Sequence, residues 1–388
     1  MTTIYTYIPS QTMNNLICSF RLILSIVLLA SVGGLAIAGD LTTNRERFLY
    51  VAAPGVRDDL ALGGHGVLVF DINDQHKFVK RISLDGYGLD QKGKVLNIKG
   101  ICANARTSRL YVSTLQQLLC IDLLTDTAIW QKSFDLGCDR MSITPDGKEI
   151  YLPSLENKAW YIVDATTGND ITRLVLNSRS HNTVVGLDGK RAYLAGLGSP
   201  YLAVASTANH TVESKIGPFG NSVRPFTING AQTRVLANVN GLLGFEIGDL
   251  TTGKVIDRVE VKGFPMGTPK RHGCPSHGIG LTPDEREIWL CDSFNSCLHI
   301  FDATISPPSQ GPSIALREQP GWITFSLDGA FAYPSTGEVI DAKSRKIIAT
   351  LSDEEGRPVH SEKLMEIDFK KGKPLETGDQ FGLGRVLP

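Results

Sequence analysis

Residues 141–152 read Met-Ser-Ile-Thr-Pro-Asp-Gly-Lys-Glu-Ile-Tyr-Leu, and this pattern recurs along the chain. The recurrences are residues 183–194, 279–290 and 323–333, with weaker copies that begin at Ile101 and Phe226. Each copy has alternating apolar residues on both sides of an Asp-Gly turn or its equivalent. Asp starts such a turn by hydrogen-bonding its own backbone, and Gly supplies the positive φ that the turn requires. Each copy therefore predicts a β-hairpin.

A second repeated element follows each hairpin: an apolar strand that ends in Asp, a short turn and another strand. The marker residues are Asp71, Asp122, Asp164, Asp249, Asp302 and Asp341, with Ala205 in the same place in a degenerate copy. Successive markers are 39 to 53 residues apart, a period typical of the four strands of one propeller blade. The seven markers predict an all-β protein, a seven-bladed β-propeller with four-stranded blades.

The two ends of the repeat region are incomplete in complementary ways. The region begins near residues 45–51, which match the second strand of a blade, so the first unit lacks its inner strand. Residues 363–369, after the last unit, form one more alternating apolar segment. We expect this C-terminal strand to join the N-terminal blade and close the ring, because closure removes exposed sheet edges. Residues 40–388 are therefore interpreted as one propeller domain.

The first 39 residues differ from the repeats. Arg21 precedes a largely apolar run, residues 22–38, which ends in Ala36-Ile37-Ala38 before Gly39. A positive charge, an apolar run and a small-x-small motif are typical of a secretory signal peptide. We interpret residues 1–39 as a signal peptide, with Met13 as an alternative start. The mature protein is then expected to be periplasmic or secreted, with no membrane association after cleavage.

Charge and motifs exclude several classes of function. The formal net charge of −1 lacks the basic excess typical of nucleic-acid-binding domains, so we expect no nucleic-acid partner. The chain has no Gly-x-Ser-x-Gly nucleophile motif, no phosphate-binding P-loop, no Rossmann fingerprint and no Cys-x-x-Cys-His haem attachment motif. We predict no cofactor, and we expect a monomer.

Four short motifs within the repeats carry a family resemblance. They are Tyr-Val at 50–51 and 111–112, Thr-Pro-Asp-Gly at 144–147 and Val-Asp-Ala-Thr-Thr-Gly at 163–168. With them, residues 45–370 resemble the YVTN-type propeller repeats of bacterial exported proteins, a group that includes YncE-like proteins. The resemblance implies the propeller fold. It leaves function open, because members of this superfamily and of the related lactonase-type propellers do different things on one scaffold.

Basic residues recur where the innermost strand of each blade begins. The position two residues before the first apolar residue is, in successive blades, Lys99, Asp139, His181, Arg224, His277 and Gly321. Arg140 follows Asp139, and His360 lies near the start of the proposed closing strand. Because inner strands surround the central channel, we expect these side chains to form a basic funnel on one face. Polar residues also occur there without any function, since propeller channels are commonly wet.

The favoured interpretation is that the funnel binds a small anionic or polar ligand. Arg224 offers a planar fork for carboxylate or phosphate, and Lys99 adds a point charge. A lactonase-like hydrolase or isomerase is the first alternative, in which His181 or His277 acts as general acid or base and Arg224 stabilises an oxyanion. Asp139 would orient a histidine only if the two are close.

A metal-dependent enzyme is the second alternative. His181, His277 and His360 would then supply imidazole ligands from separate blades. A protein partner is the other kind of binding that the sequence allows. It would contact the long loops at residues 52–66 and 263–276, which we expect on the same face as the funnel.

Export would permit disulfides. Six cysteines follow the predicted signal peptide. Cys291 and Cys297 flank a short loop, so we predict a disulfide between them. Cys102 and Cys120 are equally well explained as buried free thiols.

Overall fold

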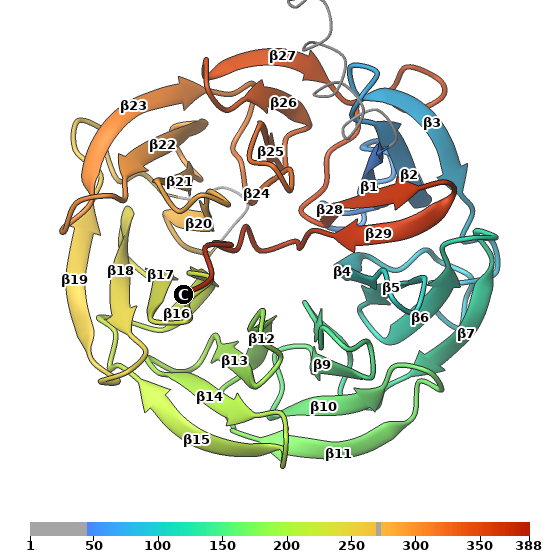
Figure 1. The fold of residues 1–388 in the computed structure, drawn as a ribbon, viewed down its shortest axis with the longest axis horizontal. Helices are drawn as coiled ribbons and strands as arrows, with labels where there is room; N and C mark the ends of the chain where they lie inside the picture. The colour runs from blue at the N-terminus through green and yellow to red at the C-terminus, as the bar shows by residue number, and fades with distance from the viewer. Residues whose placement is uncertain (1–44, 269–272) are drawn as a thin grey trace, which may run out of the picture. The chain divides into compact units, whose positions relative to one another are not determined.

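The computed structural model describes residues 45–268 and 273–388, and the predicted signal peptide, residues 1–39, lies outside them. Residues 46–388 form one compact unit of seven antiparallel sheets arranged around a common centre (Figure 1). This arrangement confirms the predicted all-β, seven-bladed propeller. In the described part of the chain, no helix is long and apolar enough to cross a membrane.

Six of the blades are four-stranded sheets whose strands follow one another in chain order from the centre outward. The strands of blades two to four are β4 (Ile98–Asn104), β5 (Arg109–Thr114), β6 (Gln117–Asp122), β7 (Ala128–Ser133), β8 (Ser142–Ile143), β9 (Glu149–Pro153), β10 (Ala159–Asp164), β11 (Asp170–Val175), β12 (Ser180–Val185), β13 (Arg191–Gly196), β14 (Leu202–Ser206) and β15 (Thr211–Ile216). The strands of blades five to seven are β16 (Val223–Ile228), β17 (Arg234–Val239), β18 (Gly244–Asp249), β19 (Val255–Glu260), β20 (Ser276–Leu281), β21 (Glu287–Asp292), β22 (Cys297–Asp302), β23 (Ser309–Ala315), β24 (Ile323–Phe325), β25 (Phe331–Pro334), β26 (Glu338–Asp341) and β27 (Lys346–Thr350).

Blade one has five strands and is closed by the C-terminal segment. Its order is β29 (Lys373–Thr377), β28 (Leu364–Lys370), β1 (Glu46–Ala53), β2 (Gly66–Asp71) and β3 (Lys77–Ile82). The pairing of β28 with β1 confirms the predicted closure of the ring. The fifth strand, β29, was not predicted. It forms because Lys371 and Gly372 both have positive φ and turn the chain tightly back onto β28.

The marker aspartates stabilise the turns between the third and fourth strands. Asp164 Oδ1, at the end of β10, accepts hydrogen bonds from the backbone N–H groups of Thr166 and Thr167. In the degenerate copy the register shows a correction. In the register of β13 and β14, Ser206 and not Ala205 stands at the marker position, opposite Arg191. Ser206 Oγ accepts a hydrogen bond from the Ala208 N–H. A hydroxyl thus replaces the carboxylate in the same type of turn.

The apolar core lies between neighbouring blades. Val69 of β2, Ile101 of β4 and Ile367 of β28 belong to one buried cluster that joins blades one and two. Equivalent clusters join the other blades, so each sheet covers the apolar face of the next. With the apolar faces covered in this way, the innermost strand of each blade borders the central channel (Figure 1).

Candidate functional site

Four of the predicted funnel residues occupy the second position of an innermost strand. They are Lys99 of β4, His181 of β12, Arg224 of β16 and His277 of β20. In each of these strands the register with the next strand is interrupted at that residue, between 98 and 100, 180 and 182, 223 and 226, and 276 and 279. A β-bulge re-aims a side chain away from the regular ladder. In four blades, therefore, the same irregularity of the innermost strand directs a basic side chain toward the centre.

These side chains line one cavity of about 400 Å³, which we call the central funnel. Its lining is Val56, Arg57, Asn97, Lys99, Arg140, Glu156, Arg179, His181, Leu197, Arg224, Asn240, Gly273, His277, Glu362 and Lys363. Six Lys and Arg side chains thus face two carboxylates, in a chain whose formal net charge is −1. Of the predicted site residues, Lys99, Arg140, His181, Arg224 and His277 all belong to this lining.

Asp139 lies beneath the funnel wall and is fully buried. His181 Nδ1–H donates to Asp139 Oδ2 (2.6 Å), and Lys99 Nζ lies 3.6 Å from Asp139 Oδ1. Burial opposes ionisation of Asp139, but the charges of His181 and Lys99 outweigh it and lower the pKa of Asp139 to about 2. Asp139 is therefore ionised and orients the ring of His181.

The tautomer of His181 follows from this contact. A carboxylate only accepts hydrogen bonds, so the proton of the neutral ring is on Nδ1, and Nε2 is the acceptor. Burial lowers the pKa of His181, an effect that Asp139 opposes. The ring is accordingly biased towards the neutral form, in which Nε2 can accept a proton.

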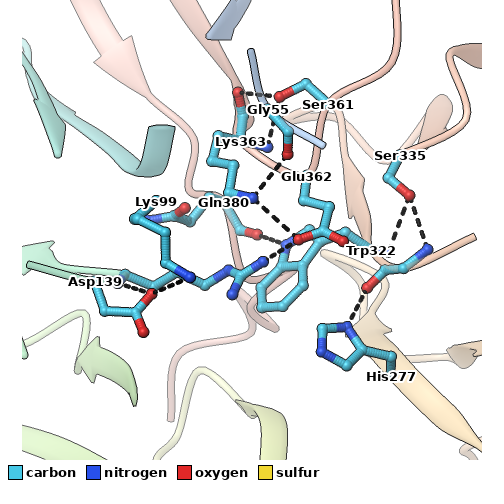
Figure 2. A network of polar contacts seen from close by, with 12 residues as sticks. Gly55, Lys99, Asp139, His277, Trp322, Ser335, Ser361, Glu362, Lys363 and Gln380 are labelled. Carbon is cyan, nitrogen blue, oxygen red and sulfur yellow. Dashed lines mark hydrogen bonds and ion pairs between the residues drawn. The ribbon is translucent and has the colours of Figure 1, made fainter. Parts of the chain in front are cut away.

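Glu362 joins the two most buried cations of the funnel. Arg140 Nη2 donates to its carboxylate, and Lys363 Nζ lies 3.0 Å from Oε2. Lys363 Nζ also donates to the carbonyl of Gly55 (2.8 Å), and Figure 2 shows the amine between these two acceptors. Burial lowers the pKa of Lys363 to about 7; Glu362 opposes this shift, while Arg140 and Lys99 add to it. The amine is therefore partly neutral near pH 7.

Figure 2 shows the Trp322 ring below Glu362, and His277 at the lower right of the same network. His277 Nδ1–H donates to the carbonyl of Gly321 (2.7 Å), and Ser335 Oγ accepts a hydrogen bond from the Gly321 N–H. Gly321, the predicted strand-entry residue that has no side chain, thus takes part in the network through its backbone. The guanidinium of Arg140 stacks on the Trp322 ring at 4.1 Å from its centre, an arrangement that stabilises a buried cation.

Several polar atoms of the funnel lining have no hydrogen-bond partner in the described part of the chain. They are Asn97 Oδ1, Arg140 Nε, Arg224 Nε and Asn240 Oδ1. Leaving such a group unsatisfied costs about 1–3 kcal/mol. Their shared position around one cavity therefore indicates bound water or a polar ligand.

The C-terminal tail closes the other end of the channel. Figure 1 shows the chain after β29 crossing the centre of the ring towards β16. The carbonyl of Gln380 accepts a hydrogen bond from Trp322 Nε1, and the Gln380 amide donates to the carbonyl of Met141 (3.1 Å). Further along, the carbonyl of Gly382 accepts from Thr227 Oγ1 (2.7 Å). The tail thus crosses the channel and contacts Trp322, on which Arg140 of the funnel stacks.

His360 does not join the funnel. Its Nδ1 lies 2.8 Å from Glu318 Oε1, and it is not part of the lining. Within residues 45–268 and 273–388, His181, His277 and His360 do not come close enough to share a metal ion. The alternative three-histidine metal site is not found there, and each Nδ1 makes a separate contact: His181 with Asp139, His277 with Gly321 and His360 with Glu318.

The predicted disulfide between Cys291 and Cys297 does not form, and both thiols are free. In the hairpin of β21 and β22, Cys291 pairs with Leu298, while Cys297 pairs with Asp292. Paired residues share a face and successive residues alternate. The two cysteines therefore point to opposite faces of blade six, which proximity in sequence does not reveal.

Sequence reasoning missed Glu362 and Lys363. The rule that selected the other ring members, two residues before the first apolar residue, selects Glu362 in the closing strand and not His360, because β28 begins at Leu364. Strict use of that rule would have found the carboxylate at the centre of the funnel. Arg57 and Arg179 come from loops and carried no comparable signal.

Comparison with known proteins gives the fold alone. No family model matches the chain, and no curated protein matches it. The β-propeller domain of Cps50 (Swd1) from Myceliophteria thermophila is similar, with a TM-score of 0.54 and 11% identity over 70% of this chain and 87% of that one. The dihydro-heme d1 dehydrogenase NirN, solved in complex with DHE, has a TM-score of 0.58 and 12% identity over 85% of this chain and 72% of that one. Both support a β-propeller, and neither supports the YVTN or YncE-like family specifically.

Proposed function

We propose that this protein binds a small organic anion in the central funnel. The observation that carries the proposal is the excess of Lys and Arg over carboxylates around one cavity of about 400 Å³. A cavity of this size suits a small molecule, since ligand pockets span roughly 300–1,000 Å³. NirN, one of the similar folds, was solved in complex with DHE, so ligand binding occurs in a protein with a related fold.

The ligand class follows from the donors. Arg224 is half-buried and lies at the funnel wall, where its fork suits a carboxylate or phosphate group. Lys99 and Lys363 supply further positive charge. Glu362 compensates part of the charge of the six Lys and Arg side chains that line the funnel. We therefore expect carboxylates, sugar acids or phosphorylated small molecules.

Calorimetric titration of the purified chain with a panel of small carboxylates, sugar acids and sugar phosphates tests this function. Arg224→Ala should weaken binding about 10- to 150-fold, which corresponds to about 1.5–3 kcal/mol for a hydrogen bond to a charged group. The double variant Arg224→Ala with His277→Ala should abolish binding and lower the melting temperature modestly, because His277 donates a buried hydrogen bond to Gly321. Arg234→Ala is the matched control, because Arg234 pairs with Asp249 on the outside of blade five. Unchanged affinity in the double variant would contradict the proposal.

A hydrolase acting on lactone-like substrates is the second candidate, and the contact between His181 and Asp139 favours it. His181 Nε2 would take a proton from water, Asp139 would hold the ring, and an Arg of the funnel would stabilise the oxyanion. Turnover should then decrease in acid as His181 becomes protonated, at a pH below the ordinary histidine pKa of ~6.5, because burial lowers the pKa of His181. His181→Gln should lower kcat/KM about 10²- to 10⁴-fold while the affinity for the product anion changes little. Binding without turnover at any pH would contradict the hydrolase and support ligand binding as the function.

Export belongs to the same proposal. The apolar run at residues 22–38 and the small-x-small motif at its end support secretion or a periplasmic location. Mass spectrometry of protein recovered from the exported fraction should show an N-terminus near residue 40. A protein partner at the loops 52–66 and 263–276 would instead make loop substitutions more damaging than funnel substitutions.

A further inference from the structure

A second cluster of chemically active side chains lies in blade six, outside the central funnel. Asp292 ends β21, and Cys297 and His299 lie on β22. Asp292 and Cys297 are register partners, and His299 is two residues beyond Cys297, so all three side chains share one face of the sheet. We propose that Asp292, Cys297 and His299 form a zinc site.

The spacing of the three ligand atoms fits tetrahedral zinc. His299 Nε2 lies 3.0 Å from Asp292 Oδ2 and 3.6 Å from Cys297 Sγ, and all three atoms lie within 4.8 Å of one another. Zinc bond lengths of about 2.0–2.3 Å imply ligand separations of ~3.3 Å for N···O and ~3.6 Å for N···S in a tetrahedron. A metal ion would therefore fit between these atoms with only small movements.

The surroundings of the cluster hold its ligands in place. Ser313 Oγ lies 2.8 Å from His299 Nδ1 and can accept the proton of that nitrogen when Nε2 binds a metal. Asp292 accepts hydrogen bonds from the backbone N–H groups of Phe294 and Asn295. Contacts of this kind orient metal ligands in proteins. The hydroxyl of Ser293, the next residue along the chain, is buried and has no partner among the described residues.

The charge balance also fits a divalent ion. Cys297 would bind as a thiolate and release its proton to solvent, Asp292 would bind as a carboxylate, and His299 would bind through Nε2 as an imidazole with its proton on Nδ1. Two negative ligands and one imidazole would neutralise Zn²⁺, and water would take the fourth position. A thiolate and an imidazole favour zinc over calcium or magnesium, which prefer oxygen ligands.

The site would be enclosed by the protein, with water as its one non-protein ligand. Asp292 and His299 are fully buried, and the Phe264 ring packs edge-on against His299 at 4.5 Å between ring centres. Asn295 also donates to the carbonyl of Pro265 (3.0 Å). The metal would thus anchor the start of the linker from β19 to β20. Gly273, a later residue of this linker, lines the funnel.

Metal analysis and cobalt titration of the purified full chain test the site. We expect one zinc ion per chain, and we expect Co²⁺ added to the chelator-treated protein to produce a thiolate-to-cobalt charge-transfer band. Cys297→Ser should abolish the band and lower cobalt affinity at least 100-fold, and Asp292→Asn should lower it about 10- to 100-fold. Cys102→Ser is the control, because this buried thiol belongs to blade two.

A measurement on the wild-type protein covers the case in which Cys297→Ser does not fold. Removal of zinc by a chelator should lower the melting temperature, and zinc added back should restore it and displace the cobalt band. Absence of stoichiometric zinc together with absence of a cobalt band in the wild type would overturn the site. Loss of the metal in His181→Ala, with Cys297→Ser still metal-bound, would also overturn it, because the metal would then belong to the funnel.

Discussion

His181 of β12 and Asp139, just before β8, form a buried hydrogen bond of 2.6 Å between Nδ1 and Oδ2. The two residues belong to neighbouring blades, and Lys99 of a third blade lies 3.6 Å from the same carboxylate. One ionised carboxylate therefore ties three inner strands together at the wall of the funnel. Its removal should affect both the stability of the ring and the state of the histidine.

Asp139→Asn should lower the free energy of unfolding by about 3–5 kcal/mol, because it removes one member of a buried charged network. Urea denaturation at neutral pH, followed by tryptophan fluorescence, measures this change. Asp135→Asn is the control, since Asp135 is an exposed partner of Arg173 and should cost less than about 1 kcal/mol. Equal stabilities of the two variants would show that the buried contact contributes little.

Acid should destabilise the wild-type protein in two stages. The lowered pKa of His181 means that the unfolded chain takes up this proton first, so stability decreases as the pH falls below about 6.5. The pKa of Asp139 is about 2 in the folded chain and ~3.9 when exposed, so its contribution is present above pH ~4 and is lost as the pH approaches 2. Denaturation curves across this range should show both stages in the wild type. Asp139→Asn should weaken the lower stage, to which other carboxylates with a lowered pKa, such as Asp292 and Asp328, also contribute. An identical pH profile would refute this assignment.

Glu362→Gln should have opposite effects on binding and stability. It leaves Arg140 and Lys363 without their shared counter-charge, so the affinity for a small anion should increase severalfold while the melting temperature falls. Glu156→Gln is the matched control, because Glu156 also lines the funnel but is 43% exposed and pairs with Arg179. Calorimetry and thermal melts on both variants check this. A loss of anion affinity in Glu362→Gln would mean that the carboxylate itself contacts the ligand.

Lys363 should be unusually reactive near neutral pH. Its pKa of about 7 leaves much of the amine unprotonated at pH 7.5, whereas an exposed lysine has a pKa near 10.4. Brief reductive methylation followed by peptide mass spectrometry should modify Lys363 faster than Lys148, whose side chain is 80% exposed. A bound anion should slow the reaction, because it favours the charged amine. Labelling that follows exposure alone would contradict the lowered pKa.

Two truncations separate closure of the ring from closure of the channel. Deletion of residues 360–388 removes β28, which pairs with β1 along six positions, and should abolish cooperative folding. Deletion of residues 379–388 keeps β28 and β29 but removes the buried side chains of Phe381 and Leu383. This shorter deletion should cost roughly 3–6 kcal/mol at ~1.5–3 kcal/mol for each side chain. Circular dichroism melts distinguish the two, and a cooperative melt of the longer truncation at the full-length temperature would disprove the role of β28.

The sequence by itself determined the architecture and most of the funnel. The Asp-Gly hairpins and the marker aspartates act over a few residues, so each blade is specified locally and the repeat period counts the blades. The positions of Lys99, His181, Arg224 and His277 were predictable for the same reason. Each occupies the same local place in its hairpin, and identical hairpins in a ring present identical places to the centre.

Only the tertiary structure decided which of these side chains touch. The bond between Asp139 and His181 joins residues 42 apart, and the contact between Arg140 and Glu362 joins residues 222 apart. Such contacts depend on the angle between blades and on where the closing strand meets the first sheet, and no local pattern encodes either. The same holds for the tail that crosses the channel and for Cys291 and Cys297, which strand register places on opposite faces. A propeller repeats its local geometry faithfully, but its chemistry arises where non-equivalent residues of different blades meet at the centre.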